Sequence, residues 1–253
     1  MPGNSFLFAH LQSLPYFRAL IRSVESTYYQ ELPLSRPVID VGCGDGIFAA
    51  LTFKQKIDAG LDPWRNPIHE AKKVKAYRML VEADGARTPF ATNTFASGLS
   101  NSVLEHISNV DAVLAEIARV LKKDSPFYFC VPNPRYLSEL SMSNYLGRGY
   151  TKWFQKTSRV VHADDPDVWR ERLVRAGFEL ERWWHYFSPA ALRMLEWGHY
   201  FGLPSLLARQ LTHHWILSPT RWNLGLTEKV LRRYASPEPL DTGTFTFYIA
   251  RKK

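Results

Sequence analysis

The chain has 253 residues with a hydrophobic share of 45%, which supports a full core and allows one large α/β domain. Lys and Arg number 32 against 24 Asp and Glu, and the net charge of +8 favours contact with anionic surfaces, whether RNA, phospholipid or an acidic metabolite. The two cysteines, Cys43 and Cys130, have the spacing of neither a disulfide pair nor a metal site, which indicates a reducing, cytoplasmic compartment. We expect no metal, no signal peptide and, because no run of about 18 apolar residues occurs, no membrane-spanning helix.

Apolar residues at helical spacing predict a first helix over residues 14–32. Short apolar runs and helical patterns then alternate along the first half of the chain. Strands are expected at 37–41, 57–62, 79–84, 95–101 and 127–132, and helices at 46–54, 66–74 and 109–121. Strands that alternate with helices are typical of a parallel, doubly wound sheet.

The pattern loosens in the second half of the chain. Residues 133–165 are polar, aromatic and glycine-containing, so we expect a loop with one short helix. A helix at 167–176 is followed by Gly177, a residue that commonly ends helices. Two further strands are expected, at 178–186 and 244–250.

The most informative motif is the stretch Val38–Gly46, which reads VIDVGCGDG. A short apolar strand carries the acidic residue Asp40 and is followed by three glycines at alternate positions. Glycines after a buried strand let the backbone turn tightly and pass close to a bound nucleotide. The pattern is not the G-x-G-x-x-G that binds a pyrophosphate. An acidic strand end is a poor neighbour for a pyrophosphate and a good one for an ammonium or a sulfonium.

This motif closely resembles motif I of the class I S-adenosylmethionine (SAM) methyltransferases. The later segments Ala83-Asp84-Gly85 and Val103-Leu104-Glu105-His106 are similar to the broad small-molecule branch of that family, the methyltransferase type 11 group. The resemblance covers residues 35–131 well, and 166–186 and 243–251 weakly. It implies SAM as the cofactor and a seven-stranded, mostly parallel, Rossmann-like sheet with a helical insertion before the last strand.

On this resemblance the whole chain, 1–253, is a single methyltransferase domain. It comprises an N-terminal helical segment, a Rossmann-like core, a helical insertion of two or three helices that is rich in aromatic and basic residues, and a final strand. These parts span residues 1–34, 35–187, 188–242 and 243–253, in that order.

The resemblance also implies which residues hold the cofactor. The methionine part of SAM would lie against the first motif, which contributes Asp40, Gly42, Cys43, Gly44 and Gly46. The ribose, the adenine and the methyl group would lie against Asp62 with Pro63, Asp84 with Gly85, and Asn101 with Ser102, respectively. Two of these roles have simpler alternatives, since Asp62 could cap the helix that follows and Asp84 could form an Asx turn before Gly85.

Methyl transfer needs mainly alignment and exclusion of water, because a sulfonium is already a strong methyl donor. A hydroxyl acceptor would also need a general base, and His106, one helical turn beyond the fourth strand, is the nearest candidate. Its alternative role is to orient a neighbour or cap a helix. Weaker candidates lie in the loop after the fifth strand, namely Tyr145, Tyr150, His162 and Asp164.

The insertion at 188–242 combines an apolar mass with surrounding arginines. Three roles are open: a cap on the sheet edge, a lid over an apolar or lipid-like acceptor, and a peripheral membrane contact that would make a cytoplasmic protein membrane-associated.

The leading hypothesis is a SAM-dependent methyltransferase with a small-molecule or lipid-like acceptor. An RNA methyltransferase is the alternative that the net charge favours. It is weakened because base-modifying enzymes of this fold usually carry Asn/Asp-Pro-Pro-Tyr/Phe where this chain has Asn101-Ser102-Val103-Leu104. A non-catalytic SAM-binding scaffold is the third hypothesis, and the intact glycine loop with Asp62 and Asp84 disfavours it.

Overall fold

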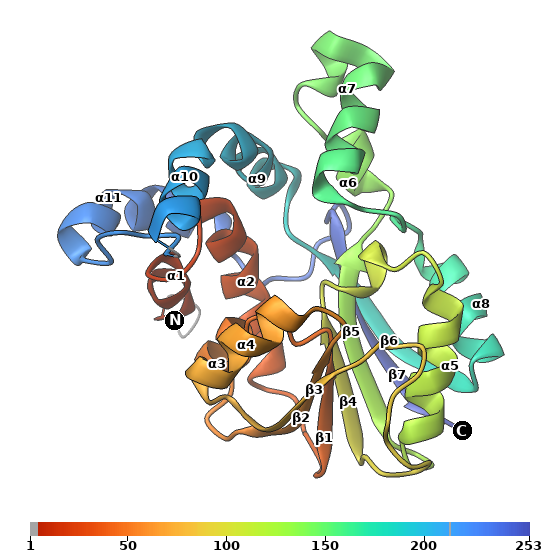
Figure 1. Cartoon of the computed structure of the whole chain (residues 1–253). Coiled ribbons are helices and arrows are strands. Elements are labelled where there is room, and N and C mark those ends of the chain that lie inside the picture. Colours follow the sequence, from red (N-terminus) through yellow and green to blue (C-terminus); the bar gives the residue numbers. More distant parts are fainter. Residues whose placement is uncertain (1–4, 213) are drawn as a thin grey trace.

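The computed structural model describes residues 5–212 and 214–253, which form the arrangement in Figure 1. Within these residues the strands make one seven-stranded sheet in the order β3-β2-β1-β4-β5-β7-β6. The strands are β1 (Val38–Val41), β2 (Ile57–Asp62), β3 (Tyr77–Glu82), β4 (Ser97–Asn101), β5 (Pro126–Pro132), β6 (Phe178–Tyr186) and β7 (Phe245–Lys252). β1 to β5 pair in parallel, and β7 is antiparallel to both of its neighbours. The predicted mostly parallel, seven-stranded sheet is confirmed.

The sheet has a hydrophobic core on each face. Successive strand residues point to opposite faces, so Val38 belongs to one core and Ile39 to the other. The first core lies under the helices α1 (Ser5–Leu11), α2 (Tyr16–Tyr29), α3 (Ile47–Thr52) and α4 (Arg65–Val74). The second lies under α5 (Val110–Val120) and α8 (Pro166–Arg175). Because both faces are covered, the inner strand β1 is buried along its whole length, including the acidic Asp40 that interrupts its apolar run.

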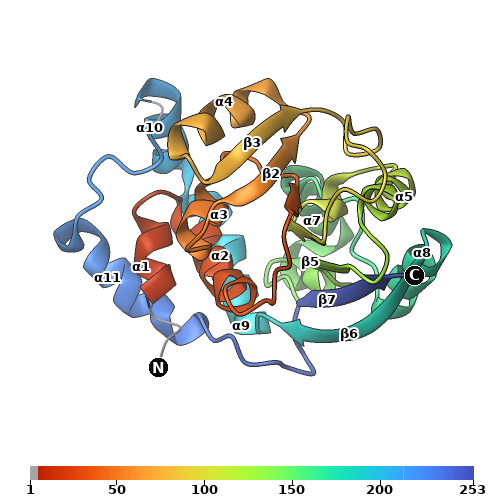
Figure 2. The same cartoon turned by 90° about the horizontal axis from the view of Figure 1, so that it is seen from below.

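The remaining helices lie beyond the carboxyl ends of the parallel strands, as Figure 1 shows. They are η2 (Leu104–His106), α6 (Arg135–Ser138), α7 (Ser143–Ser158), α9 (Pro189–Phe201), α10 (Leu203–Thr212), α11 (Arg221–Leu231) and η3 (Arg232–Tyr234). The last four connect β6 to β7, which confirms a helical insertion before the last strand. Figure 2 shows α10 and α11 along one side of the molecule, with α11 next to α1.

The first helix of the sequence prediction differs from the structure. The expected helix over 14–32 is α2, and a separate helix, α1, precedes it. Pro15 lies between them with a ψ of 147°. Proline disfavours helical backbone in the residue before it, so the two helices cannot join.

The segment 133–165 is more helical than predicted, because it contains both α6 and α7. A kink at Gly147, with φ 64° and ψ −160°, divides α7. The helix buries only Tyr150 and Phe154, so its apolar residues do not form the continuous stripe that marks a helix in a sequence.

Candidate active site

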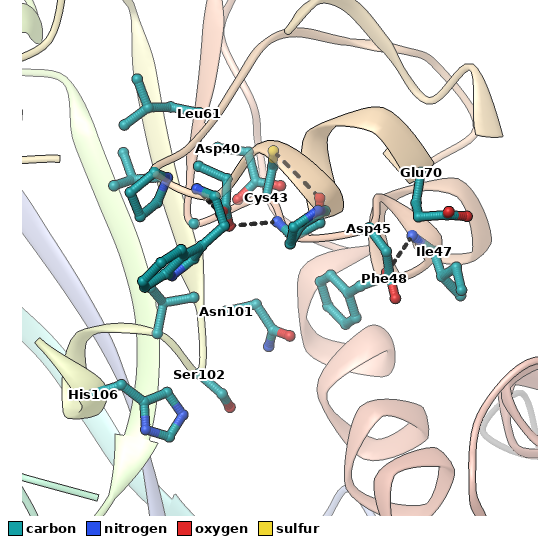
Figure 3. A pocket seen from close by; sticks show the side chains of 18 of the residues that line it. Asp40, Cys43, Asp45, Ile47, Phe48, Leu61, Glu70, Asn101, Ser102 and His106 are labelled. Atoms are coloured by element: carbon teal, nitrogen blue, oxygen red, sulfur yellow. Dashed lines mark hydrogen bonds between the residues drawn. The ribbon is translucent and has the colours of Figure 1, made fainter. Parts of the chain in front are cut away.

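A cavity of about 910 Å³ lies at the carboxyl ends of β1, β2 and β4. β1 lies between β2 and β4 in the sheet, and the chain order reverses between β1 and β4. Ligands of open α/β sheets bind at such a switch point. The lining of this cavity contains ten of the residues that the sequence predicts at the cofactor site: Asp40, Gly42, Cys43, Gly44, Asp62, Pro63, Asp84, Gly85, Asn101 and Ser102. The general-base candidate His106 joins them, and Figure 3 shows it with Asn101 and Ser102 around the same space as Asp40 and Cys43.

Gly46 is the expected site residue that is absent from the described lining of this cavity. It precedes α3 with a φ of 76°, a conformation that favours glycine. A Cβ there would lie 3.2 Å from Ala71 and from Tyr77, so this glycine allows α3 to pack closely. In this structure Gly46 serves the packing of α3, and its contact with the methionine part of SAM stays a prediction.

The other two glycines of the loop shape the cavity wall. The backbone N–H groups of Gly42 and Cys43 both donate to the carbonyl of Leu61, at 2.7 and 2.9 Å, which fixes the turn after β1. A Cβ on Gly42 would lie 2.4 Å from Cγ1 of Val103, whereas a Cβ on Gly44 would have nothing within 4 Å. The backbone is therefore bare at Gly44, where a ligand can approach it.

Asp62, at the carboxyl end of β2, holds its carboxylate in a fixed orientation. One oxygen accepts the N–H of Gly44 at 3.0 Å, and the other accepts the N–H of Trp64 at 2.9 Å. The bond to Trp64 is the local, turn-like contact that the capping alternative foresees, but the bond to Gly44 joins β2 to the glycine loop. Burial raises the pKa of this carboxyl, and the two backbone donors partly oppose that rise. Each oxygen retains room for one more donor.

Asp40 is a second buried acid in the cavity wall, with only 3% of its surface exposed. The hydroxyl of Tyr77 donates to its Oδ2 at 2.6 Å. Burial raises the pKa of Asp40 to about 7, against the opposing effect of that hydrogen bond. A cation placed beside Asp40 would favour its ionised form.

Asp84 forms the Asx turn that was its alternative role. Its Oδ1 accepts the N–H of Ala86 at 2.9 Å, and β3 ends at Glu82, two residues earlier than the expected strand over 79–84. Asp84 is exposed and Gly85 is buried, and both line the cavity. The turn therefore orients the carboxylate at the cavity edge and does not exclude a ligand.

His106 lies on η2 with 42% of its side chain exposed. Its Nδ1 is 2.9 Å from the carbonyl oxygen of Arg159. A carbonyl can only accept, so Nδ1 carries the proton and the neutral ring presents Nε2 as an acceptor. Burial lowers the pKa of His106, so the ring is neutral at neutral pH.

The weaker catalytic candidates lie outside the described lining of the cavity. Tyr145 is 83% exposed on α7, and the hydroxyl of Tyr150 donates to Glu196 at 2.7 Å. Nε2 of His162 lies 3.0 Å from the carbonyl oxygen of Ile107, and Asp164 pairs with Arg172 at 3.0 Å. Their contacts are structural.

The comparison with protein families agrees with the fold and the motif. Residues 39–129 match a family described as a methyltransferase domain. This segment is therefore identified as a methyltransferase domain, and the fold is that of the class I SAM-dependent methyltransferases.

Similar proteins extend this comparison. An uncharacterized methyltransferase of Mycobacterium tuberculosis is 30% identical over 135 residues, which are 51% of this chain and 53% of that protein. A ubiquinone/menaquinone biosynthesis C-methyltransferase of Desulfotalea psychrophila is 36% identical over 95 residues, or 36% of this chain and 39% of that one. The alignment with the mycobacterial methyltransferases therefore spans about half of their length.

Similarity over almost the whole chain appears at the level of fold. The crystal structure of a SAM-dependent methyltransferase from Thermotoga maritima, a possible histamine N-methyltransferase, has a TM-score of 0.57 and 17% identity. The superposition covers 94% of this chain and 90% of that one. It shows that the methyltransferase fold extends beyond the matched residues 39–129.

Part of the cavity wall comes from outside the matched methyltransferase segment. It includes Arg18 and Arg22 of α2, Arg209 of α10, and Trp215. The guanidinium carbons of Arg18 and Arg209 lie 5.9 and 5.7 Å from the centre of the Trp215 ring. The N-terminal helix and the insertion therefore both contribute to the site. No motif marked these residues in the sequence.

A buried polar cluster behind the cavity was also missed in the sequence. Its centre is Glu25 of α2, whose side chain has no exposed surface. It pairs with Arg22 at 2.6 Å and accepts hydrogen bonds from Asn101 and Ser102, each at 2.9 Å. The hydroxyl of Tyr186 donates to it at 2.9 Å. The available signal was a charged residue among the apolar positions that face the core in α2.

The described residues show neither a metal-binding cluster nor a membrane-spanning helix. They contain no cluster of three His, Cys, Asp or Glu side chains suited to a metal ion. None of their helices has the length and apolar character needed to cross a membrane.

Proposed function

We propose that this protein transfers a methyl group from SAM to a small-molecule or lipid-like acceptor. The observation that carries the proposal is the Asp62 carboxylate, which two backbone N–H groups hold at the wall of a 910 Å³ cavity. A carboxylate in this position can accept two hydroxyl donors at once, which matches the two vicinal hydroxyls of a ribose. The cavity is large for a small-molecule pocket, for which about 300–1,000 Å³ is usual. It therefore has room for an acceptor beside the cofactor.

The residues present fit this cofactor. Gly44 leaves the backbone bare beside Asp62, and Asp40 supplies a buried negative charge for a ligand with a cationic centre. Asp84 and Gly85 border the cavity one strand further along the sheet, where an adenine would lie if the ribose occupies Asp62. When bound, SAM supplies an activated methyl group on a sulfonium.

The chain's own part in the reaction is positioning and, for a hydroxyl acceptor, removal of a proton. Nε2 of His106 is the acceptor atom for that proton, since Nδ1 is committed to the Arg159 carbonyl. Alignment of the two reacting groups can contribute about 7–11 kcal/mol to lowering the barrier.

The apolar part of the lining supports an acceptor with a hydrophobic body. It includes Leu14, Ile47, Phe48, Val103, Ile107 and Trp215. The similar Desulfotalea psychrophila protein is named for the synthesis of ubiquinone and menaquinone, which agrees with an apolar acceptor.

We further propose that α10 acts as a lid over this site. Arg209 and the following Trp215 reach the cavity, yet none of the described side chains of α10 is buried. A helix with so little buried surface can move away at low cost.

The test is calorimetric titration of SAM and S-adenosylhomocysteine into the wild type and Asp62→Ala. Removing a carboxylate that accepts two hydroxyls should weaken binding by about a hundredfold or more, because hydrogen bonds to charged groups contribute about 1.5–3 kcal/mol each. Asp167→Ala, which removes an exposed carboxylate from α8, is the matched control and should bind as the wild type does. Absence of binding by the wild type, or equal binding by Asp62→Ala, would contradict the proposal.

A further inference from the structure

The segment from α10 to η3 exposes more large apolar side chains than packing requires. Trp222 is 92% exposed, Leu211 is 82% exposed and Leu226 is 74% exposed. Leu207 and Leu217 of the same segment are more than half exposed. Single exposed apolar residues are normal, but a concentration of them in one segment marks a surface that contacts something.

In α11 the exposed apolar side chains recur at helical spacing and therefore lie on one face of the helix. The inward face of α11 packs against the protein: Leu224, Glu228 and Leu231 are buried, and the helix contacts α1. Trp222, Leu226 and Val230 recur every four residues and are all exposed, so they form a stripe on the opposite face. Helix α11 therefore has two apolar faces, and only one of them serves the fold.

The charge of the same segment is strongly one-sided. Residues 203–234 contain five basic residues: Arg209, Arg221, Lys229, Arg232 and Arg233. Their only acid is Glu228, which is buried and pairs with Arg221 at 3.5 Å and Arg232 at 2.7 Å. Lys229 is exposed and lies within one turn of Leu226 on the helix surface. The exposed apolar stripe is thus bordered by positive charge, with no exposed carboxylate in the segment.

We propose that the surface formed by α10, α11 and the residues between them docks onto an anionic lipid bilayer. Exposed Trp and Leu side chains with basic neighbours on a helix that lies flat are the features of an interfacial membrane contact. Each Lys or Arg held near an anionic leaflet adds to the attraction. A second copy of this chain fits the surface less well, because it would bring a second group of positive charges to the same place.

The position of this surface bears on access to the cavity. Arg209 on α10 and Trp215, which follows it, line the cavity, while Leu207 and Leu211 of the same helix are exposed. Figure 2 shows α10, the connecting segment and α11 on one side of the molecule, away from β6 and β7. This consequence rests on the proposed function, in which α10 is a lid and the acceptor is apolar. Docking would then place the lid at the bilayer, in which such an acceptor dissolves.

The test is co-sedimentation of the full chain with phosphatidylcholine vesicles, with and without one third phosphatidylglycerol. The double variant Trp222→Ser/Leu226→Ser removes apolar side chains that contact little of the protein, and Lys229→Glu reverses one exposed charge. Matched controls lie elsewhere on the surface: Val174→Ser on α8, whose side chain is 61% exposed, and Lys123→Glu before β5.

We expect the wild type to bind the anionic vesicles and to bind the neutral ones much more weakly. Trp222→Ser/Leu226→Ser should lose about tenfold or more in affinity, and Lys229→Glu about tenfold on anionic vesicles alone. The two controls should bind as the wild type does. These four results together would support the inference.

Three outcomes would overturn it. The wild type could bind neither vesicle, the double variant could bind as well as Val174→Ser, or light scattering could show a dimer that the double variant alone dissociates. SAM titration keeps the two proposals separate. The double variant should bind SAM normally, and Asp62→Ala should keep its vesicle binding, so either proposal can fail alone.

Discussion

Replacing Asp40 by asparagine should make the protein more stable relative to the wild type as the pH rises. The wild-type carboxyl is 3% exposed, and burial raises its pKa from 3.8 to about 7. An acid with a raised pKa binds its proton more tightly in the folded state than in the unfolded chain. Its contribution to stability is fully present below the unfolded pKa of 3.8 and is lost as the pH rises through about 7. Asparagine has no such dependence.

The magnitude follows from the two pKa values. The pKa of Asp40 is 3.8 in the unfolded chain and about 7 in the folded protein. Relative to acid pH, this difference lowers the wild-type free energy of unfolding by about 2 kcal/mol at pH 5 and by about 4 kcal/mol at pH 8. The difference between Asp40→Asn and the wild type should therefore grow by about 2–3 kcal/mol across this range. The asparagine carbonyl can still accept from Tyr77, and any cost of placing its amide group is the same at both pH values. For a chain of this size the change is roughly 4–10 °C in melting temperature.

The assay is denaturant unfolding of both proteins at pH 5 and pH 8, without cofactor. Asp167→Asn is the control, because that carboxylate is 82% exposed and should give the same difference from the wild type at both pH values. A difference between Asp40→Asn and the wild type that stays constant with pH would refute the argument, since it would mean that Asp40 carries no buried charge at pH 8.

Two further predictions concern the reaction and the glycine loop. His106→Gln should slow methyl transfer to a hydroxyl acceptor by about 10²–10⁴-fold in single-turnover assays without changing SAM affinity, and unchanged rates would remove the base role. The wild-type rate should hold through neutral pH and fall only in acid, because burial lowers the pKa of His106. Gly42→Ala should cost about 3 kcal/mol or more in unfolding free energy, since its Cβ would lie 2.4 Å from Val103 in a backbone with φ of 83°. Gly177→Ala, with positive φ but nothing within 4 Å, should cost only about 1–2 kcal/mol, and adding Val103→Ala to Gly42→Ala should recover only part of the excess, because the Cβ that residue 103 keeps would still lie 2.8 Å away.

The part of the site that could be predicted from sequence is the part that local patterns determine. A buried parallel strand reads as an apolar run, and the carboxyl ends of such strands meet at one edge of the sheet. Asp40, Gly44 and Asp62 could therefore be brought together from their positions alone. The error in β3 was also local in origin, since the turn that Asp84 makes with Ala86 ends the strand at Glu82.

The walls contributed by helices could not be predicted, because contacts between distant residues create them. The start of α7 depends on Glu196 of α9, whose carboxylate accepts the N–H groups of Ser141 and Met142 at 2.7 and 3.1 Å. Those partners lie 55 and 54 residues away in sequence. Arg22 reaches Asn101 across 79 residues. Helical periodicity shows which face of a helix is apolar, but not which strand end that face will cover.

The Glu25 cluster changes how Asn101 and Ser102 can serve a ligand. The Asn101 amide accepts from Arg22 and donates to Glu25, and the Ser102 hydroxyl donates to Glu25 at 2.9 Å. Both side chains are thus engaged with α2. Ser102 also has a φ of 48°, a left-handed conformation that is uncommon for serine and that this hydrogen bond helps to hold. We therefore infer that the end of β4 presents its backbone to the cavity, and that α2, which lies outside the matched methyltransferase segment, fixes the shape of that wall.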